Sequence, residues 1–304
     1  FFLFVVFFEF LVIFYTGMEE YIKTITEDGS ITYYHTGYEE HYHSIAGAQS
    51  EAFYKFIHPS GLIEKSQSET VKILDVPFGL GVNALTSLEY YQNVEIFAVE
   101  KDPDICFISL QDEIPVKSKK IIESLKTHGK YLRDNQKLSL RIGDARIVLG
   151  SNEISGQKFD AVFLDPFSPQ KNPELWTLEC FRLLFRLLNE NGLVLTYSSA
   201  LPVRAGLLRA GFFVGQTPAF GRKRGGTLAA KSPDKITIPL QPEEEYLLHH
   251  TTGKIPYRDY HLCMPPEKIL VLREKTVRRA VKQGILKTIK KGIREYQKEN
   301  TISD

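Results

Sequence analysis

The chain has 304 residues, of which 43% are apolar, and a formal net charge of +1. This length and composition exclude a disordered or fibrous protein, because the chain can bury a sizeable core, and they predict a globular fold. The charge is unevenly spread: residues 273–298 hold ten Lys or Arg and two acids, and residues 117–137 hold seven and two. These basic segments disfavour a basic partner and are compatible with a polyanion.

The first stretch, "FFLFVVFFEFLVIFYTG", is strongly apolar but is interrupted by Glu9. A membrane-spanning helix needs roughly 20 apolar residues, so we expect no membrane anchor here. Met18 begins a more ordinary sequence. Residues 1–17 are therefore expected to be either upstream or non-native sequence, or a buried strand or helix.

The cysteines are too scattered to form a disulfide framework or a zinc pattern. Cys106, Cys180 and Cys263 lie far apart in the chain. Their simplest interpretation is three inert thiols in a reducing compartment, which predicts a cytoplasmic protein.

The apolar pattern divides the chain into three parts. Residues 1–60 form an N-terminal extension, in which Gly-led turns and aromatic or β-branched residues favour short strands. Residues 61–231 alternate short apolar runs with helix-like stretches, which predicts a Rossmann-like α/β domain with a parallel sheet. Residues 232–304 form a C-terminal extension, irregular at first and then a basic helix with Val277, Ile285 and Ile289 as its packed stripe.

The predicted strands of the α/β domain are "VKILDV", "VEIFAVE", "LSLRIGD", "FDAVFLD" and "GLVLTYSS". The predicted helices cover roughly residues 82–91, 104–125, 174–189 and 202–210. Gly192 in "NENGL" is expected to end the third of these helices.

The sequence "VKILDVPFGLGVNALT" predicts a strand, a glycine turn and a helix start. Gly79 and Gly81 allow close approach of the backbone to a ligand, and Asn83 opens the helix whose amides favour polar groups. Glu100 ends the next strand, where an acid can accept hydrogen bonds from both ribose hydroxyls. Together these four residues predict a nucleoside-bearing ligand.

That nucleoside could belong to a dinucleotide, because residues 79–84 fit the relaxed G-x-G-x-x-G/A fingerprint. Two further acids favour another ligand. Asp144 follows the third strand, where it could bind an adenine amino group, and Asp165 follows the fourth and faces the same crevice. A pyrophosphate would prefer fewer carboxylates nearby, whereas S-adenosyl-L-methionine carries an amine and a sulfonium. We therefore expect S-adenosyl-L-methionine.

Asp165 opens the sequence "DPFSP", which resembles the Asp/Asn-Pro-Pro-aromatic loop of amino-group methyltransferases. A carboxylate there can orient an amine and accept its proton, and positioning supplies much of the rate. Phe167 and Trp176 are candidates for stacking on an unstacked base. The alternative is that Asp165 caps a turn and Trp176 belongs to the core.

Longer strings carry a more specific resemblance. "FDAVFLDPFSPQKNPELWT", "YSSALPVRAGLLRAGF" and "FGRKR" resemble the methyltransferase module of the bacterial enzymes that finish 5-methylaminomethyl-2-thiouridine at the tRNA wobble position. "PFGLGVNALT" fits that family's cofactor loop, and the match covers roughly residues 38–230. The resemblance implies methylation of a wobble 5-aminomethyl-(2-thio)uridine in the anticodon loop of tRNA.

The resemblance also implies roles for individual residues. Gly79, Glu100, Asp144 and Asp165 would be cofactor and catalytic positions. The residues implied to contact the acceptor or the RNA are Lys171, Asn172, Trp176, Arg222, Lys223 and Arg224.

Two departures from the family are visible. Its well-known members carry a fused flavin-dependent oxidase, for which this sequence has no room, so we expect a stand-alone methylase supplied by a separate flavin-dependent enzyme. The family's Asp-Gly-Phe is Asp-Pro-Phe here, and Pro166 removes a backbone donor and stiffens the loop.

Other interpretations stay open. An aminopropyltransferase of the spermidine-synthase kind, or another amino-group methyltransferase, would share the fold and the acidic crevice. His35, His41 and His43 match no zinc signature, so we expect no metal. The cationic C-terminal segment is compatible with a solvated face or with tRNA binding.

Overall fold

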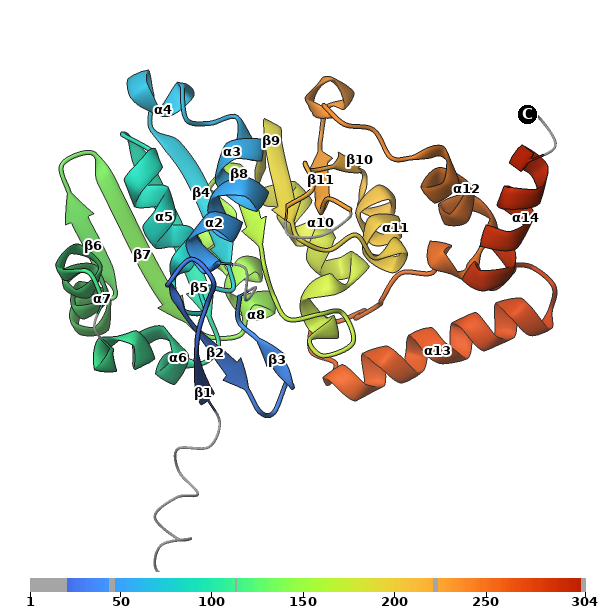
Figure 1. Ribbon diagram of the computed structural model, residues 1–304, viewed down its shortest axis with the longest axis horizontal. Coiled ribbons are helices and arrows are strands. Elements are labelled where there is room, and N and C mark those ends of the chain that lie inside the picture. The colour runs from blue at the N-terminus through green and yellow to red at the C-terminus, as the bar shows by residue number, and fades with distance from the viewer. Residues whose placement is uncertain (1–20, 44–46, 113, 221–223, 302–304) are drawn as a thin grey trace, which may run out of the picture.

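The protein is described by a computed structural model that covers residues 21–43, 47–112, 114–220 and 224–301. Figure 1 shows a central twisted sheet with helices on both sides and a C-terminal group of helices beside it. The expectation for residues 1–17 lies outside the described residues.

An eight-stranded sheet runs through the part of the chain that the structure describes. Its middle strands are parallel, whereas β6 at one edge and β11 and β10 at the other end of the sheet are antiparallel to their neighbours. In spatial order the strands are β10 (Phe213–Gln216), β11 (Thr227–Ala230), β9 (Leu188–Thr196), β8 (Phe159–Leu164), β4 (Val71–Val76), β5 (Val94–Glu100), β7 (Gln136–Ile142) and β6 (Lys130–Arg133).

The order of the parallel strands is that of a doubly wound nucleotide-binding fold. The chain starts in the centre at β4, moves outward through β5 to β7, and then returns to β8 and β9 on the other side of β4. The direction of winding therefore reverses between β4 and β8, and ligands bind at such a switch point. The predicted Rossmann-like fold is confirmed.

The sheet is buried on both faces, which explains why its strands are continuous apolar runs. On β4, Ile73 joins the core on one face and Leu74 joins the core on the other. The helices that follow or connect the strands are α5 (Val82–Tyr90), α6 (Pro103–Ile108), α7 (Val116–His128), α8 (Ala145–Gly150), α9 (Asn152–Ser155), α10 (Leu178–Leu187) and α11 (Leu201–Ala210).

The N-terminal extension contributes a small sheet and a helical segment. The sheet pairs β1 (Tyr21–Ile25), β2 (Ile31–His35) and β3 (Glu40–His41) in antiparallel fashion, which confirms the predicted short strands. The helical segment contains α2 (Ala48–Ala52), a π-helical turn η1 (Phe53–Ile57) and α3 (His58–Ser60), and the short helix α4 (Lys65–Ser68) then leads into β4. Phe56 and Ile57 are fully buried in the core of the main sheet, so this segment is part of the core packing.

The C-terminal extension is helical. It contains α12 (Pro242–His250), α13 (Pro266–Lys282) and α14 (Ile289–Thr301), with short 3₁₀ turns at η4 (Pro233–Lys235) and η5 (Thr252–Lys254). The single basic helix predicted there is wrong, since Gly284 adopts a left-handed φ of 68° and separates α13 from α14. Ile285 lies in that break and is 67% exposed, so it is no part of a packed stripe.

Four other helix predictions can be compared with the structure. The helices predicted at 82–91 and 202–210 are confirmed as α5 and α11. The helix predicted at 104–125 is two, α6 and α7, joined by the turn η2 (Ser109–Gln111) and a segment that ends at Pro115. The helix predicted at 174–189 begins as the turn η3 (Pro173–Trp176) and continues as α10, and Gly192 lies in β9 and does not end the helix.

A buried ion pair fastens the C-terminal extension to the sheet edge. Arg146 of α8 donates from Nη1 to Asp259 at 2.8 Å and also to the Met264 carbonyl at 2.8 Å. Asp259 is fully buried, and its other oxygen accepts the backbone N–H groups of Cys263 and Met264 at 3.1 Å. The chain entering α13 is thereby held against the end of β7.

We expect Asp259→Asn to lower the free energy of unfolding by about 3 kcal/mol, because it leaves a buried guanidinium without one of its counter-charges. Glu190→Gln is the matched control, since it removes an ion pair with Lys231 in which Glu190 is 92% exposed, and exposed pairs contribute about 1 kcal/mol or less. Urea unfolding of the two variants measures the difference. Equal losses would contradict the role given to Asp259.

Candidate active site

The site lies where β4 and β8 end, at the switch point of the sheet. After β4, the chain turns sharply through Gly79 and Gly81, which have left-handed φ values of 54° and 78°. A Cβ at Gly81 would lie 2.4 Å from the ring of Phe78, so glycine is required there for space as well as for φ. The turn delivers the chain into α5 with Gly81 as its N-cap residue.

Glu100, at the end of β5, holds this glycine turn in place. One oxygen accepts the Gly79 N–H at 2.8 Å, and the other accepts the N–H groups of Lys101 and Asp102 at 2.7 and 3.0 Å. Burial raises the pKa of Glu100, while these backbone hydrogen bonds act to lower it. Oε2, which accepts only one of these three N–H groups, still has a lone pair for a ligand hydroxyl, because a carboxylate offers about four acceptor sites.

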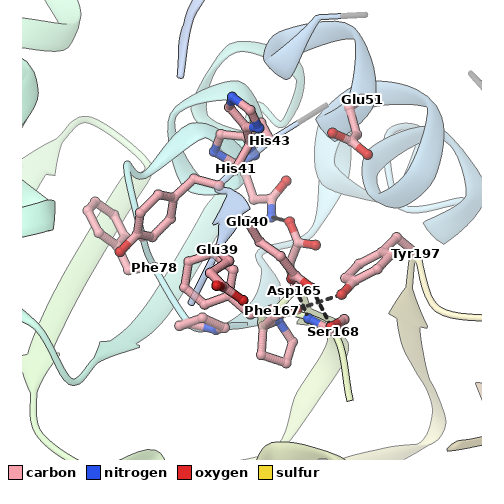
Figure 2. Close-up of a pocket in the computed structure, with 15 residues that line it drawn as sticks. Glu39, Glu40, His41, His43, Glu51, Phe78, Asp165, Phe167, Ser168 and Tyr197 are labelled. Atoms are coloured by element: carbon pink, nitrogen blue, oxygen red, sulfur yellow. Dashed lines mark hydrogen bonds between the residues drawn. The ribbon is translucent and has the colours of Figure 1, made fainter. Parts of the chain in front are cut away.

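Two cavities flank this point and share the residues Tyr42, Pro77 and Phe167. The first, of about 460 Å³, is lined by Gly79, Asn83 and Asp165 among others (Figure 2). The second, of about 620 Å³, is lined by the strand-end acids Glu100 and Asp144 together with Asp102, Asn172 and Glu174. Both volumes fall in the range of small-molecule and cofactor sites.

Asp165 follows β8 directly and is held in place from α5. Its Oδ2 accepts the Asn83 side-chain N–H at 2.9 Å. The next residue is fixed too, because the Tyr197 hydroxyl, from the end of β9, donates to the Pro166 carbonyl at 2.9 Å. Figure 2 shows Asp165, Phe167 and Ser168 together, with Tyr197 pointing toward them. The carboxylate therefore presents a fixed face to the first cavity.

The N-terminal sheet holds the loop after Asp165 from the opposite side. Glu40 of β3 accepts hydrogen bonds from the Ser168 backbone N–H, at 2.8 Å, and from the Ser168 hydroxyl. The Phe167 ring stacks on Tyr38, with centroids 4.4 Å apart, and meets Tyr42 edge-on at 4.8 Å. Segments 128 residues apart in the chain thus enclose one cavity.

The first cavity has a strongly acidic wall. Glu39, Glu40, Glu51 and Asp165 all line it. Glu51 is ion-paired with Lys55, and both side chains are almost completely buried. An enclosed site with this many carboxylates favours a cationic or hydrogen-bond-donating group over an anion.

Comparison with known proteins agrees with this geometry. A family described as S-adenosyl-L-methionine-dependent methyltransferase matches residues 110–232. The uncharacterized protein MJ0670 of Methanocaldococcus jannaschii is 34% identical, covering 94% of this chain and 84% of that protein. The crystal structure of MnmC2 from Aquifex aeolicus is 37% identical, covers 85% of both chains and superposes with a TM-score of 0.74. The chain belongs to the MnmC methyltransferase family.

Further relatives are fused to other sequence. The tRNA 5-methylaminomethyl-2-thiouridine biosynthesis bifunctional protein MnmC of Azoarcus sp. is 33% identical over 222 residues, which are 66% of this chain. The chain spans about a third of the length of that relative, 34%.

Among the residues that the structure describes, no helix has the length and apolar character that crossing a membrane requires.

The methyltransferase uses S-adenosyl-L-methionine, and the described residues fit that cofactor. The two cavities adjoin at Tyr42, Pro77 and Phe167, with Glu100 lining one and Asp165 lining the other. Glu100 suits a ribose, and the acidic first cavity suits the positively charged sulfonium and amine. Contact of the cofactor with the turn at Gly79 and Gly81 stays a prediction.

Asp144 takes part in the site less directly than the sequence predicts. Its two oxygens accept the Arg146 guanidinium, at 3.1 Å from Nε and 2.7 Å from Nη2, and the Arg146 backbone N–H at 2.9 Å. Burial acts to raise the pKa of Asp144, but the bonds and the charge of Arg146 hold it below its ordinary value. Asp144 lines the second cavity as a paired carboxylate, and contact with adenine stays a prediction.

The proposed contact of Trp176 with a base is wrong, because its side chain is fully buried in the core. Its indole N–H donates to the Phe167 carbonyl at 2.8 Å, so Trp176 supports the loop from behind. Lys171 pairs with Glu39 at the rim of the first cavity. Asn172 lines the second cavity and donates to Glu174 at 2.9 Å.

The basic residues of "FGRKR" are only partly described. Arg222 and Lys223 lie outside the described residues. Arg224 is exposed and lies 3.6 Å from Glu244 of α12, away from the residues that line the two cavities. Its contact with RNA stays a prediction.

Of the histidines singled out in the sequence, His35 has backbone partners, whereas the buried Nε2 of His43 has no hydrogen-bond partner among the described residues. The His35 ring nitrogen Nδ1 accepts the backbone N–H groups of Gly37 and Tyr38 at 3.1 and 3.4 Å. Burial lowers the pKa of His43 to about 4. Within the described ranges, no group of three or more His, Cys, Asp or Glu side chains is arranged to hold a metal ion.

Sequence reasoning missed Glu40, Tyr42, Glu51 and Tyr197 as site residues. Tyr197 could have been found, because it follows a predicted parallel strand and so had to lie at the same edge of the sheet. The other three come from the N-terminal extension. Tyr42 and Glu51 lie in "YHSIAGAQSEAFY", which weakly fits the family's upstream Tyr-x-Ser, Gly and Glu pattern, whereas the position of Glu40 over the crevice depends on long-range packing.

Asp75, near the end of β4, is a buried acid whose charged form is unfavourable. It is fully buried, and neither carboxylate oxygen has a hydrogen-bond partner among the described residues. Burial, and then the charges of Asp165 and Glu100, raise its pKa well above the ordinary value. Asp75 is therefore favoured in the neutral, protonated form.

The raised pKa of Asp75 makes a prediction about stability. Above pH 4 the unfolded chain loses this proton while the folded chain keeps it, so wild-type stability falls with rising pH until the folded pKa is passed. Asp75→Asn removes this contribution. We expect the wild type to lose up to about 1.4 kcal/mol per pH unit relative to the variant in that window. Denaturant unfolding between pH 4 and 8 measures it, and parallel curves would contradict the assignment.

Proposed function

We propose that this methyltransferase transfers a methyl group to the amine of a wobble 5-aminomethyl-(2-thio)uridine in the anticodon loop of tRNA. The observation that carries the proposal is Asp165, fixed by Asn83 in an acid-lined cavity that adjoins the cofactor side of the switch point. The printed name of the MnmC relatives, with tRNA 5-methylaminomethyl-2-thiouridine biosynthesis, supports the same substrate.

The acidic wall supports an amine acceptor. A primary amine arrives largely protonated at neutral pH, and the carboxylates of Glu39, Glu40, Glu51 and Asp165 would attract that cation into the first cavity. The amine reacts only after losing a proton, because its lone pair must face the electrophile. The site therefore has to bind a cation and then remove a proton from it.

Asp165 is the proposed acceptor of that proton. S-adenosyl-L-methionine, when bound, supplies an electrophilic methyl carbon on sulfur, so that an N–C bond forms as the S–C bond breaks. The proton that the ammonium loses before transfer passes to Asp165 and then to solvent. Formation of the N–C bond then gives a secondary ammonium, and the sulfur leaves as a neutral thioether. Asn83 fixes the carboxylate rotamer, and the Tyr197 bond to the Pro166 carbonyl fixes the loop, so that the nitrogen is held in line.

Phe167 is the proposed platform for the base. Its ring lines both cavities and is backed by Tyr38 and Tyr42. Bases in a single-stranded loop can be unstacked and placed on an aromatic side chain, which suits an anticodon nucleotide.

A substrate of this kind implies a cytoplasmic reaction. A separate flavin-dependent enzyme is proposed to supply the aminomethyl group where a carboxymethyl group must first be removed.

The direct test incubates the protein, S-adenosyl-L-methionine and tRNA carrying wobble 5-aminomethyluridine, and then digests the RNA. We expect the wobble nucleoside, and no other, to gain the mass of one methyl group. Transfer of an aminopropyl group from the decarboxylated cofactor would instead support the aminopropyltransferase alternative. Unchanged RNA with bound cofactor would reject the proposal.

Asp165→Asn tests the mechanism, because it keeps the shape and removes the base. We expect methyl transfer to fall by about 100-fold or more, as is usual on loss of a general base. Cofactor and tRNA binding, measured by calorimetry, should change little. The control is Asp234→Asn, an exposed acid in η4 outside both cavities, which should transfer methyl groups at the wild-type rate. Wild-type activity in the Asp165 variant would remove this carboxylate from the mechanism.

A further inference from the structure

The helix α13 begins beside the active site and leads away from it. The carbonyl of Met264, two residues before the helix, accepts a hydrogen bond from Arg146, the partner of the cavity residue Asp144. The helix packs against η3, which follows the loop that begins at Asp165. Figure 1 shows α13 on the same lower side of the molecule as β1–β3, extending to the right. A molecule entering the crevice from this side would meet α13.

One face of α13 is used for packing. Ile269 is fully buried in the core. The Arg273 side chain lies on the same face. Its Nε donates to the Ile255 carbonyl at 2.9 Å, and its guanidinium lies 5.0 Å from the centre of the Tyr257 ring. These positions are one turn apart, so they define the inner face of the helix.

The opposite face is cationic. Lys268, Lys275, Arg279 and Lys282 are exposed and follow one another at intervals of seven, four and three residues, which places them on one side of a helix. In the described part of the chain, none of the four forms an ion pair with a carboxylate. Another cation of this helix, Arg278, lies beside this row and forms an ion pair with Glu274.

A merely solvated helix would be expected to mix charges of both signs on its outer face, as i,i+4 pairs stabilise it. Along α13 the cations run for 14 residues, or about 21 Å at 1.5 Å per residue, with no acid on the same face. The second basic helix, α7, differs, since Lys117, Lys119 and Lys120 point in different directions around it. In Figure 1, α7 lies at the far side of the sheet from α13.

We infer that the outer face of α13 binds the phosphate backbone of the RNA stem that adjoins the target nucleotide, while the crevice takes the nucleotide itself. This inference rests on the proposed function. A row of exposed cations about 21 Å long can contact several phosphates of one strand, and such contacts position an RNA without reading its sequence. The C-terminal extension thereby aligns tRNA with the cavity that holds Asp165.

The test is the triple variant Lys275→Gln, Arg279→Gln and Lys282→Gln. We expect its KM for tRNA to rise tenfold or more at moderate salt, with kcat at saturating tRNA within about twofold of the wild type. Because each lost phosphate contact lowers the salt dependence of binding by about one unit of slope, the plot of log affinity against log salt should flatten by two to three. The matched control is Lys117→Gln, Lys119→Gln and Lys120→Gln on α7, which should retain the wild-type KM and slope.

Two measurements separate this inference from the proposed function. Cofactor binding and thermal unfolding should be the same in the wild type and both triple variants, because all six side chains are exposed. A wild type that methylates no tRNA would reject the proposed function. A wild type that methylates tRNA, with a KM and salt slope unchanged in the α13 variant, would reject only the α13 surface. Equal losses in the α13 and α7 variants would reject it too, since they would indicate a general charge effect.

Discussion

The parallel pairing of β4 with β5 on one side and β8 on the other is the constraint on which the site depends. Parallel strands end at the same edge of a sheet, so Gly79, Glu100 and Asp165 arrive together although 86 residues separate the first from the last. Because the winding reverses between β4 and β8, the connecting segments diverge there and leave a crevice instead of a packed surface. The glycine turn borders this crevice without a side chain at Gly79, and Glu100 holds the turn in place by accepting the Gly79 N–H.

The parallel sheet places Asp165, but other elements give it a defined orientation. Asn83 comes from α5 and Tyr197 from β9, and each contributes one hydrogen bond to the loop. Glu40 closes the loop from outside the sheet through Ser168. A reacting nitrogen has to be held within a narrow range of angles, and a carboxylate on an unsupported loop would not achieve this. Of these three supports, Glu40 is the one that the small N-terminal sheet supplies.

Charge follows the same division of the molecule. The crevice gathers carboxylates, and these suit a cationic cofactor and an amine. The cationic side chains gather on the C-terminal helices, outside the crevice. The overall charge of +1 thus conceals an acidic interior beside a basic surface. The Arg146–Asp259 pair joins the two regions, because it binds the segment leading into α13 to the edge of the site.

The sequence by itself determined the strands of the sheet, the glycine turn and the strand-end acids, because apolar runs of this length and the turn residues after them are local patterns. It also determined the family, through a motif around Asp165 that is continuous in the chain. Only the tertiary structure decided which side chains face the ligand. Trp176 lies in the distinctive string but points into the core, whereas Glu40 and Tyr42 come from the N-terminal extension, where the family pattern is matched only weakly, and line the cavity. Side-chain direction and long-range packing depend on contacts between distant residues, and no window of sequence contains those contacts.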